Sequence, residues 1–128
     1  MSNLLLDKIK QSYIIEIVGI GIDIIEIKRV ENMVEHWGDS FLNRIFSDRE
    51  LEEWRMRGER MAFLAGRFAT KEAFLKAAGV RGAAWKEIEV LGPPMERPKI
   101  WFKGKSEKGI DVSISHTEEL VISVVITR

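Results

Sequence analysis

The sequence contains no cysteine, which excludes disulfide bonds, thiolate nucleophiles and zinc sites with sulfur ligands. It has only two histidines, His36 and His116, so a bound metal would depend on oxygen ligands and would be a hard cation such as Mg²⁺. An excess of one charge is also missing, because 20 basic residues balance 20 acidic ones. The overall charge therefore gives no attraction to nucleic acid or to an anionic membrane.

A long, uninterrupted apolar run is absent as well. The longest apolar segment, residues 13–27, is broken by Glu16, Asp23 and Glu26, whereas a membrane-spanning helix needs about 20 mostly apolar residues. The first residues also lack the order of a signal peptide, a basic segment followed by an apolar and then a small-residue segment. We expect a cytoplasmic protein that forms a single domain over residues 1–128, since most domains have about 100 to 150 residues.

Residue patterns predict an α+β fold. Residues 14–27 are rich in β-branched side chains and predict a strand, and the alanine-rich stretch 59–79, ended by Gly79, predicts the longest helix. Further helices are predicted over 27–37, 41–46 and from Asp48 onward, after a capping-box pattern at Ser47 and Glu50. Four short β-like runs follow at 88–91, 100–102, 112–116 and 120–127, the last two as a hairpin. An antiparallel sheet with a long central helix is the expected architecture.

Two carboxylates stand where apolar side chains are the rule. Alternation along the first strand puts Asp23 on the same face as Gly19 and Gly21, which let another element come close. On a helical wheel, Glu72 falls within an apolar stripe of the long helix. If this helix covers the strand, the two carboxylates meet, and a divalent cation would relieve their repulsion. The alternative is that Glu72 pairs with Lys76 four residues later and that Asp23 caps the next helix.

Several cations and one histidine accompany these carboxylates. Arg67, Lys71 and Lys76 lie within about two helical turns of Glu72 and could bind phosphate oxygens, or could form an ordinary solvated helix edge. His116 ends a predicted strand and is either a turn residue or a hydrogen-bond donor to a phosphate. No serine has a visible histidine and aspartate pairing, so a hydrolase triad is not indicated.

Four segments match one known family in the same order. They are GIGIDIIEIKRV at 19–30, FSDRELE at 46–52, LAGRFATKEAFLKAAG at 64–79 and VSISHTEELVISVVI at 112–126. Together they resemble the holo-acyl carrier protein synthases, the small bacterial type of 4′-phosphopantetheinyl transferase. The GIGID strand and the GRFATKEAFLKA helix are the most specific parts of this resemblance.

The resemblance implies an activity, an assembly and a cofactor. Family members use Mg²⁺ to transfer the 4′-phosphopantetheine arm of coenzyme A to a serine of apo-acyl carrier protein, for fatty acid biosynthesis, and release adenosine 3′,5′-bisphosphate. The small members resemble one another in being trimers, with coenzyme A sites in clefts between neighbouring subunits. A trimeric 4′-phosphopantetheinyl transferase-like fold is therefore expected. Residues 1–14 precede the usual start of the family and are interpreted as an N-terminal extension.

The resemblance also implies metal and catalytic residues. Asp23 and Glu72 would be the metal ligands, with pyrophosphate oxygens and water completing the coordination. Lys76 would stabilise the transferred phosphoryl oxygens. The incoming serine would lose its proton to Glu72 or to a water on the metal, two alternatives that the sequence leaves open.

Coenzyme A and the carrier protein have their own implied contacts. Arg67 and Lys76 would bind coenzyme A phosphates, and His116, with Ser115 near it, would lie close to the reacting phosphate or the nucleotide. The docking face for the acidic carrier is predicted on the helix that carries three residues, Lys28, Arg29 and Met33, with Arg44 and Arg49 as additions. A competing hypothesis is a nonenzymatic trimer of the same fold that binds coenzyme A or acts as a scaffold.

Overall fold

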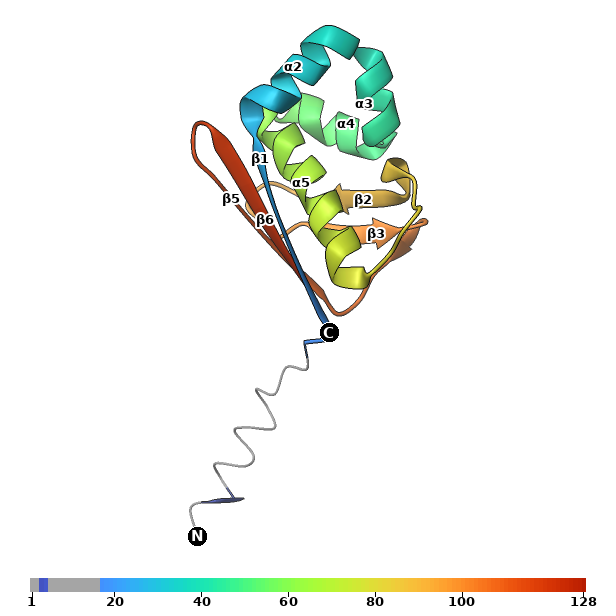
Figure 1. Ribbon diagram of the computed structural model, residues 1–128, viewed down its shortest axis with the longest axis vertical. Helices are drawn as coiled ribbons and strands as arrows, with labels where there is room; N and C mark the ends of the chain where they lie inside the picture. The colour runs from blue at the N-terminus through green and yellow to red at the C-terminus, as the bar shows by residue number, and fades with distance from the viewer. Residues whose placement is uncertain (1–2, 5–16) are drawn as a thin grey trace.

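The computed structural model describes residues 3–4 and 17–128 (Figure 1). The N-terminal extension predicted over 1–14 therefore lies almost entirely outside the described residues, as does the start of the predicted first strand. Strand β1 spans Gly19–Glu26, and Ile27 already opens the next helix. The strand ends one residue earlier than predicted because the amphipathic spacing of the helix begins at Ile27.

Four α-helices follow the predicted pattern. They are α2 (Ile27–Trp37), α3 (Asp39–Ile45), α4 (Asp48–Met56) and α5 (Met61–Ala78). The predicted capping box is present at the start of α4, where Ser47 and Glu50 satisfy each other's backbone N–H groups. Gly79 ends α5 in the left-handed conformation, as predicted. No helix of the described part of the chain is both long and apolar enough to cross a membrane.

The strands form two antiparallel sheets, where the sequence predicted one. The first sheet has the order β1-β6-β5, with β5 (Ile110–His116) and β6 (Leu120–Thr127) as the predicted hairpin. The second has the order β2-β3-β4, with bounds Ile88–Leu91, Lys99–Phe102 and Lys105–Ser106. Apolar residues of β2 and β3 pack on α5 and share one core cluster with Val112 of β5 and Val125 of β6, although no described strand pairs across the two sheets. The α+β fold with a long central helix is confirmed.

Helix α5 is central because it contacts both sheets (Figure 1). It rests directly on β1 at Gly19 and Gly21. A Cβ atom at Gly19 would collide with the carbonyl oxygen of Ala77, and one at Gly21 with that of Ala73. Glycine is thus required at both positions for the helix to approach the strand this closely.

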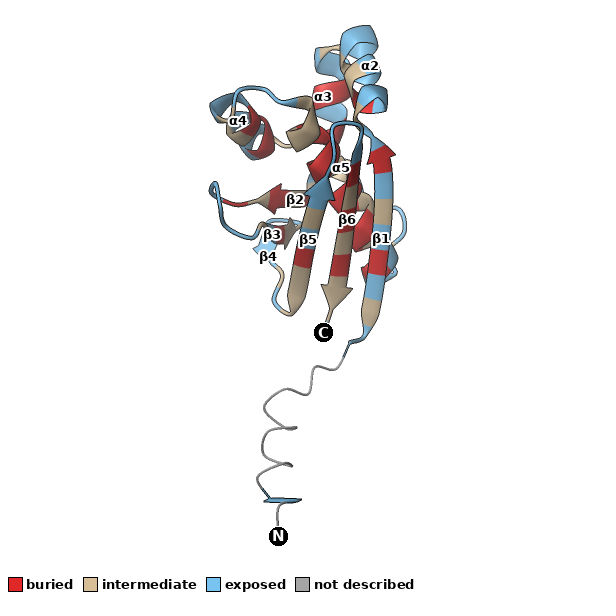
Figure 2. Cartoon of the chain, turned by 90° about the vertical axis from the view of Figure 1, so that its left-hand side faces the viewer, coloured by how far each residue is buried: buried red, intermediate tan, exposed pale blue. Residues whose placement is uncertain are grey.

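The face of the first sheet that points away from α5 is apolar and open. Figure 2 shows the alternation of buried and exposed positions along β1. Ile20, Ile22 and Ile24 are 64%, 54% and 60% exposed. Their cross-strand partners on β6 are also aliphatic: Ile126, Val124 and Ile122. These side chains form a continuous exposed apolar row of a kind that is uncommon on monomeric proteins.

Candidate active site

Strand β1 and helix α5 bring Asp23 and Glu72 together. Asp23 faces α5 because it shares its strand face with Gly19 and Gly21. Glu72 precedes Ala73, whose carbonyl oxygen lies against Gly21. The close backbone contact of strand and helix therefore sets the distance between the two carboxyl groups.

The proximity of Asp23 has an electrostatic consequence for Glu72. Burial, and then the negative charge of Asp23 and a hydrogen bond with it, raise the pKa of the Glu72 carboxyl above its ordinary value. The charges of Lys76 and Arg29 act in the opposite direction. A half-buried carboxylate whose ionisation is disfavoured by a second carboxylate beside it forms, with that neighbour, a site for added positive charge.

Lys76 supplies one positive charge at this place. Its Nζ donates to the carbonyl oxygen of Ile22 at 3.0 Å and lies 3.5 Å from Oδ1 of Asp23. Lys76 thus forms its ion pair with Asp23, whereas the alternative from sequence paired it with Glu72. The N-cap of α2 is Glu26, so Asp23 does not cap that helix. The side chain of Lys76 is still 56% exposed and free to contact a ligand.

The carboxylate pair fits a hard divalent cation. Carboxylate oxygens are the ligands that Mg²⁺ prefers, and Mg²⁺ commonly takes only one or two from protein and the rest from water and phosphates. Among the described residues, no group of three His, Cys, Asp or Glu side chains is placed to hold a metal. Asp23 and Glu72 would therefore contribute the protein part of an otherwise open coordination sphere. We call Asp23, Glu72 and Lys76 the carboxylate cluster.

A second polar region lies at the β5 edge of the first sheet, opposite to the β1 edge that carries Asp23. A cavity of about 990 Å³ is bounded by the first half of α5, by β5 and β6, and by the segment 95–98. Its lining includes four arginines and one histidine: Arg57, Arg60, Arg67, Arg97 and His116. We call it the arginine cavity. Arg57, Arg60 and Arg97 escaped the sequence analysis because they come from irregular segments or helix ends, where no periodic pattern singles them out.

Arg67 is the most buried cation of the arginine cavity. It is 6% exposed, its guanidinium stacks 4.3 Å from the ring centroid of Phe63, and its Nη2 lies 3.6 Å from Oε1 of Glu53. Burial is the main cause that lowers its pKa. Its Nε is buried and has no hydrogen-bond partner within the described residues. An anionic ligand would satisfy this donor.

The other two predicted coenzyme A contacts lie at the end of β5. His116 lines the arginine cavity, with Nδ1 3.3 Å from the carbonyl oxygen of Thr117, whereas Ser115 points to the other face of the strand. Strand β6 separates this strand from β1. Arg67 and Glu72 are five residues apart on α5, about 140° around the helix. The carboxylate cluster and the arginine cavity are thus two separate regions of the chain.

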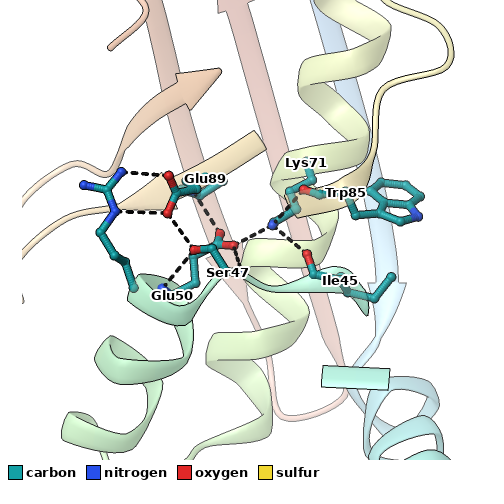
Figure 3. Close-up of polar contacts among 8 residues, drawn as sticks. Ile45, Ser47, Glu50, Lys71, Trp85 and Glu89 are labelled. Atoms are coloured by element: carbon teal, nitrogen blue, oxygen red, sulfur yellow. Dashed lines mark hydrogen bonds and ion pairs between the residues drawn. The ribbon is translucent and has the colours of Figure 1, made fainter. Parts of the chain in front are cut away.

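Lys71 does not join the cations near the carboxylates. It is fully buried and donates to Ile45 O at 2.8 Å, Glu50 Oε1 at 2.5 Å and Trp85 O at 3.1 Å (Figure 3). Oε2 of Glu50 accepts from the backbone of Val90 at 2.9 Å. This buried pair joins α5 to the α3–α4 junction, to the turn before β2 and to β2 itself. The prediction that Lys71 could bind phosphate was wrong, because its three donors are all used inside the protein.

The predicted docking residues share one surface. Lys28, Arg29 and Met33 line a shallow hollow along α2, with His36 and Trp37 at its end. All five side chains are exposed. The combination of cations and large apolar side chains suits an acidic, amphipathic partner.

The two arginines predicted as further docking residues differ in availability. Arg44 is exposed on α3. Arg49 donates from Nε and Nη2 to Glu89 at 3.1 and 2.7 Å, and Ser47 donates to the same carboxylate at 2.6 Å. The bond from Arg49 is the first cause that lowers the pKa of Glu89. The charge of Arg49 is already matched, so Arg44 is the better placed of the two.

Comparisons with known proteins agree on one family. The sequence pattern of the 4′-phosphopantetheinyl transferase superfamily matches residues 19–125. The holo-[acyl-carrier-protein] synthase of Halothermothrix orenii is 37% identical over 118 residues, which cover 84% of this chain and 94% of that protein. The matched range contains the whole carboxylate cluster and every residue that lines the arginine cavity except Ile126.

Solved structures of the same family have the same fold. The crystal structure of holo-[acyl-carrier-protein] synthase from Neisseria meningitidis is similar with a TM-score of 0.76 and 32% identity, covering 88% of this chain and 99% of that one. A holo-(acyl-carrier-protein) synthase from Bacillus anthracis, in complex with CoA (3′,5′-ADP), gives a TM-score of 0.71 and 37% identity, with 86% and 95% covered.

Proposed function

This chain belongs to the 4′-phosphopantetheinyl transferase superfamily as a holo-acyl-carrier-protein synthase, and we propose that it transfers 4′-phosphopantetheine from coenzyme A to a serine of an apo-acyl carrier protein. The phosphorus of the pantetheine phosphate forms a bond to the serine oxygen. Its bond to the bridging pyrophosphate oxygen breaks, and adenosine 3′,5′-bisphosphate leaves. The meeting of Asp23 and Glu72 beside the exposed Lys76 is the observation that carries the proposal.

The carboxylate cluster is proposed as the place of reaction. Asp23 and Glu72 would hold Mg²⁺, which supplies positive charge to neutralise the pyrophosphate and the departing nucleotide. Lys76, anchored on the carbonyl oxygen of Ile22, would stabilise the transferred phosphoryl oxygens. Glu72 is the chain's own candidate for accepting the serine proton, because its carboxylate lies beside Asp23 at the proposed place of reaction. A nearby water is the alternative acceptor.

The arginine cavity is proposed to bind the nucleotide end of coenzyme A. The buried Arg67, with its unpartnered Nε, supports a contact to phosphate oxygens. His116 would donate to the same phosphates from the end of β5, with Ser115 beside it on the strand. The complex of the Bacillus anthracis relative with CoA (3′,5′-ADP) supports coenzyme A as the ligand.

A homotrimer would explain why one protomer carries two separate regions. The carboxylate cluster lies on the β1 side and the arginine cavity at the β5 edge of the same sheet. We propose that the cluster of one subunit and the cavity of its neighbour complete one coenzyme A site. The exposed row Ile20, Ile22 and Ile24 supports such an assembly, because apolar strands of this kind are covered in stable oligomers.

The acyl carrier protein is the proposed acceptor, and α2 its docking surface. Lys28 and Arg29 would contact acidic side chains of the carrier, while Met33 would provide apolar contact. The charge of Arg29 also acts to lower the pKa of Glu72, so this end of the docking surface lies near the carboxylate cluster. We place this reaction in fatty acid biosynthesis in the cytoplasm, which cell fractionation can check.

One experiment separates transfer from the nonenzymatic alternative. The protein is incubated with coenzyme A, Mg²⁺ and an apo-acyl carrier protein, and the carrier is then weighed by mass spectrometry. A gain in mass equal to phosphopantetheine supports the transferase. Binding of coenzyme A without any gain, for every carrier tested, would support a trimeric binding module or scaffold instead.

A further inference from the structure

Glu53 joins two parts of the arginine cavity that are distant in sequence. It lies on α4, and its carboxylate accepts from the backbone N–H of Gly92 at 3.4 and 3.2 Å through Oε1 and Oε2. The same Oε1 lies 3.6 Å from Nη2 of Arg67 on α5. A single carboxylate thus contacts both the start of the segment that follows β2 and the most buried cation of the cavity.

The C-cap residue of α4 completes the hold on Gly92. Arg57, four residues after Glu53, donates through Nη2 to the carbonyl oxygen of Gly92. Both backbone polar groups of Gly92 are therefore bound by side chains of α4 and its C-cap. A Cβ atom at this glycine would lie 2.9 Å from Cα of Pro98, so the chain folds back against its own start here. Fixing Gly92 also fixes the return of the chain at Pro98.

The segment held in this way forms one wall of the arginine cavity. Met95, Glu96, Arg97 and Pro98 all line the cavity, opposite Arg67. Met95 adopts a positive φ of 70° in a turn where the backbone N–H of Glu96 donates to the carbonyl oxygen of Pro93. The wall has little secondary structure of its own, so its position depends on the α4 contacts.

We propose that Glu53 is a positioning residue of the arginine cavity, which orients Arg67 and the wall 95–98 for the nucleotide end of coenzyme A. This inference rests on the proposed function, because it takes coenzyme A as the ligand. Glu53 acts through Arg67 and Gly92. It therefore sets how tightly coenzyme A binds, while the chemical step at Asp23 and Glu72 continues unchanged.

The sign of the effect makes this proposal testable. A carboxylate near an anion site repels the ligand, so its removal would tighten coenzyme A binding if Glu53 acted only through its charge. If Glu53 positions the cavity, its removal frees Arg67 and the wall, and binding weakens in spite of the more positive field. The two roles predict opposite changes.

The experiment compares Glu53→Gln and Glu53→Ala with a matched control, Glu52→Gln. Glu52 is exposed on the same helix, so the control makes the same change in net charge. Titration calorimetry gives the Kd for coenzyme A, steady-state assays give kcat and KM, and thermal melts report folding. We expect Kd and KM to rise about tenfold in Glu53→Ala and less in Glu53→Gln, which keeps one acceptor oxygen for Gly92. The kcat should stay within about twofold of wild type, and Glu52→Gln should leave all values unchanged.

Equal or tighter binding of coenzyme A in folded Glu53→Gln would overturn the proposal. So would a loss of kcat with an unchanged KM. If Glu53→Ala does not fold, Glu53→Gln still decides, because it keeps the shape of the side chain. The Kd is measured without a carrier protein, so the test remains valid even if the wild type transfers nothing to any carrier. Absence of transfer by the wild type would contradict the proposed function and would leave this proposal to the measured Kd.

Discussion

The carboxylate cluster and the arginine cavity are built in different ways. The cluster is held by regular elements, since a strand and a helix touch backbone to backbone at Gly19 and Gly21. The cavity is held by side-chain contacts from α4 to an irregular segment and to Arg67. The proposed metal site is therefore held by rigid backbone, whereas the proposed binding site for coenzyme A depends on side-chain contacts that a few substitutions can alter.

The largest effect is expected from the carboxylate cluster. Asp23→Ala or Glu72→Ala should lower the rate of transfer by at least about a thousandfold, because one ligand of the metal and its charge are lost. The fold and the assembly should persist, since each substitution removes a repelling carboxylate. Mass spectrometry of the carrier measures transfer, and light scattering measures the assembly. Wild-type turnover in either variant would remove the metal assignment.

Next in size is the contact that holds the cluster in place. Gly21→Ala would push a Cβ atom into the carbonyl oxygen of Ala73 and should lower the free energy of unfolding by about 3 kcal/mol. Gly104→Ala is a useful comparison, because its Cβ meets nothing within 4 Å although its φ of 79° adds some strain. Denaturant unfolding measures both. An equal loss in the two variants would mean that crowding by α5 is not the cause.

A smaller effect is expected from the arginine cavity. Arg67→Met keeps much of the apolar contact with Phe63 but removes the guanidinium, so the Kd for coenzyme A should rise by about ten- to thirtyfold. Transfer at saturating coenzyme A should remain close to wild type. Arg55→Met on α4, an exposed position, is the control. A fall in kcat with unchanged Kd would place Arg67 with the reacting groups and erase the contrast between the two regions.

The smallest effect concerns pH in metal-free protein. The pKa of Glu72 is raised in the folded state, so Glu72 favours folding below its unfolded pKa, and this contribution is lost as pH rises through the folded pKa. Glu72→Gln should therefore flatten the stability curve above the ordinary glutamate pKa of about 4.3, by less than about 1 kcal/mol. Chemical unfolding in a chelator measures the difference from wild type. Burial also raises the pKa of Glu50, but Glu50 is present in both proteins. The difference between the two curves therefore reports on Glu72. A steeper curve in the variant would contradict the assignment.

Sequence reasoning reached the cluster but only part of the cavity. Period-two alternation placed Asp23 toward a covering helix, and helical spacing placed Glu72 on the matching face, because both residues belong to long regular elements. Lys71 was misassigned since its partner, Glu50, lies on another helix and no local pattern links them. Glu53 was missed for the same reason. Its partners Gly92 and Arg67 come together only through tertiary packing.

The second sheet escaped prediction on similar grounds. The sequence indicated β2 and β3 as strands, but nothing within them says on which side of α5 they pack. The outcome depends on the apolar surface that Phe74 and its neighbours on α5 leave for Ile88 and Ile100. Local patterns specify elements, and the choice between two faces of one helix is made by the whole molecule.

The ammonium group of Lys71 fixes the rotation of α5 about the helix axis. Its three hydrogens are shared among acceptors on three different segments, and turning α5 by a single residue, about 100°, would break all of these bonds together. The helix therefore has one rotational setting and no neighbouring one. The bonds of Lys71 therefore also fix the directions of its two neighbours in the helix. Thr70 points to Ser123, to which it hydrogen-bonds, and Glu72 points to Asp23. An insertion of one residue beside Lys71 would turn the carboxylate of Glu72 away from Asp23 without changing Glu72 itself.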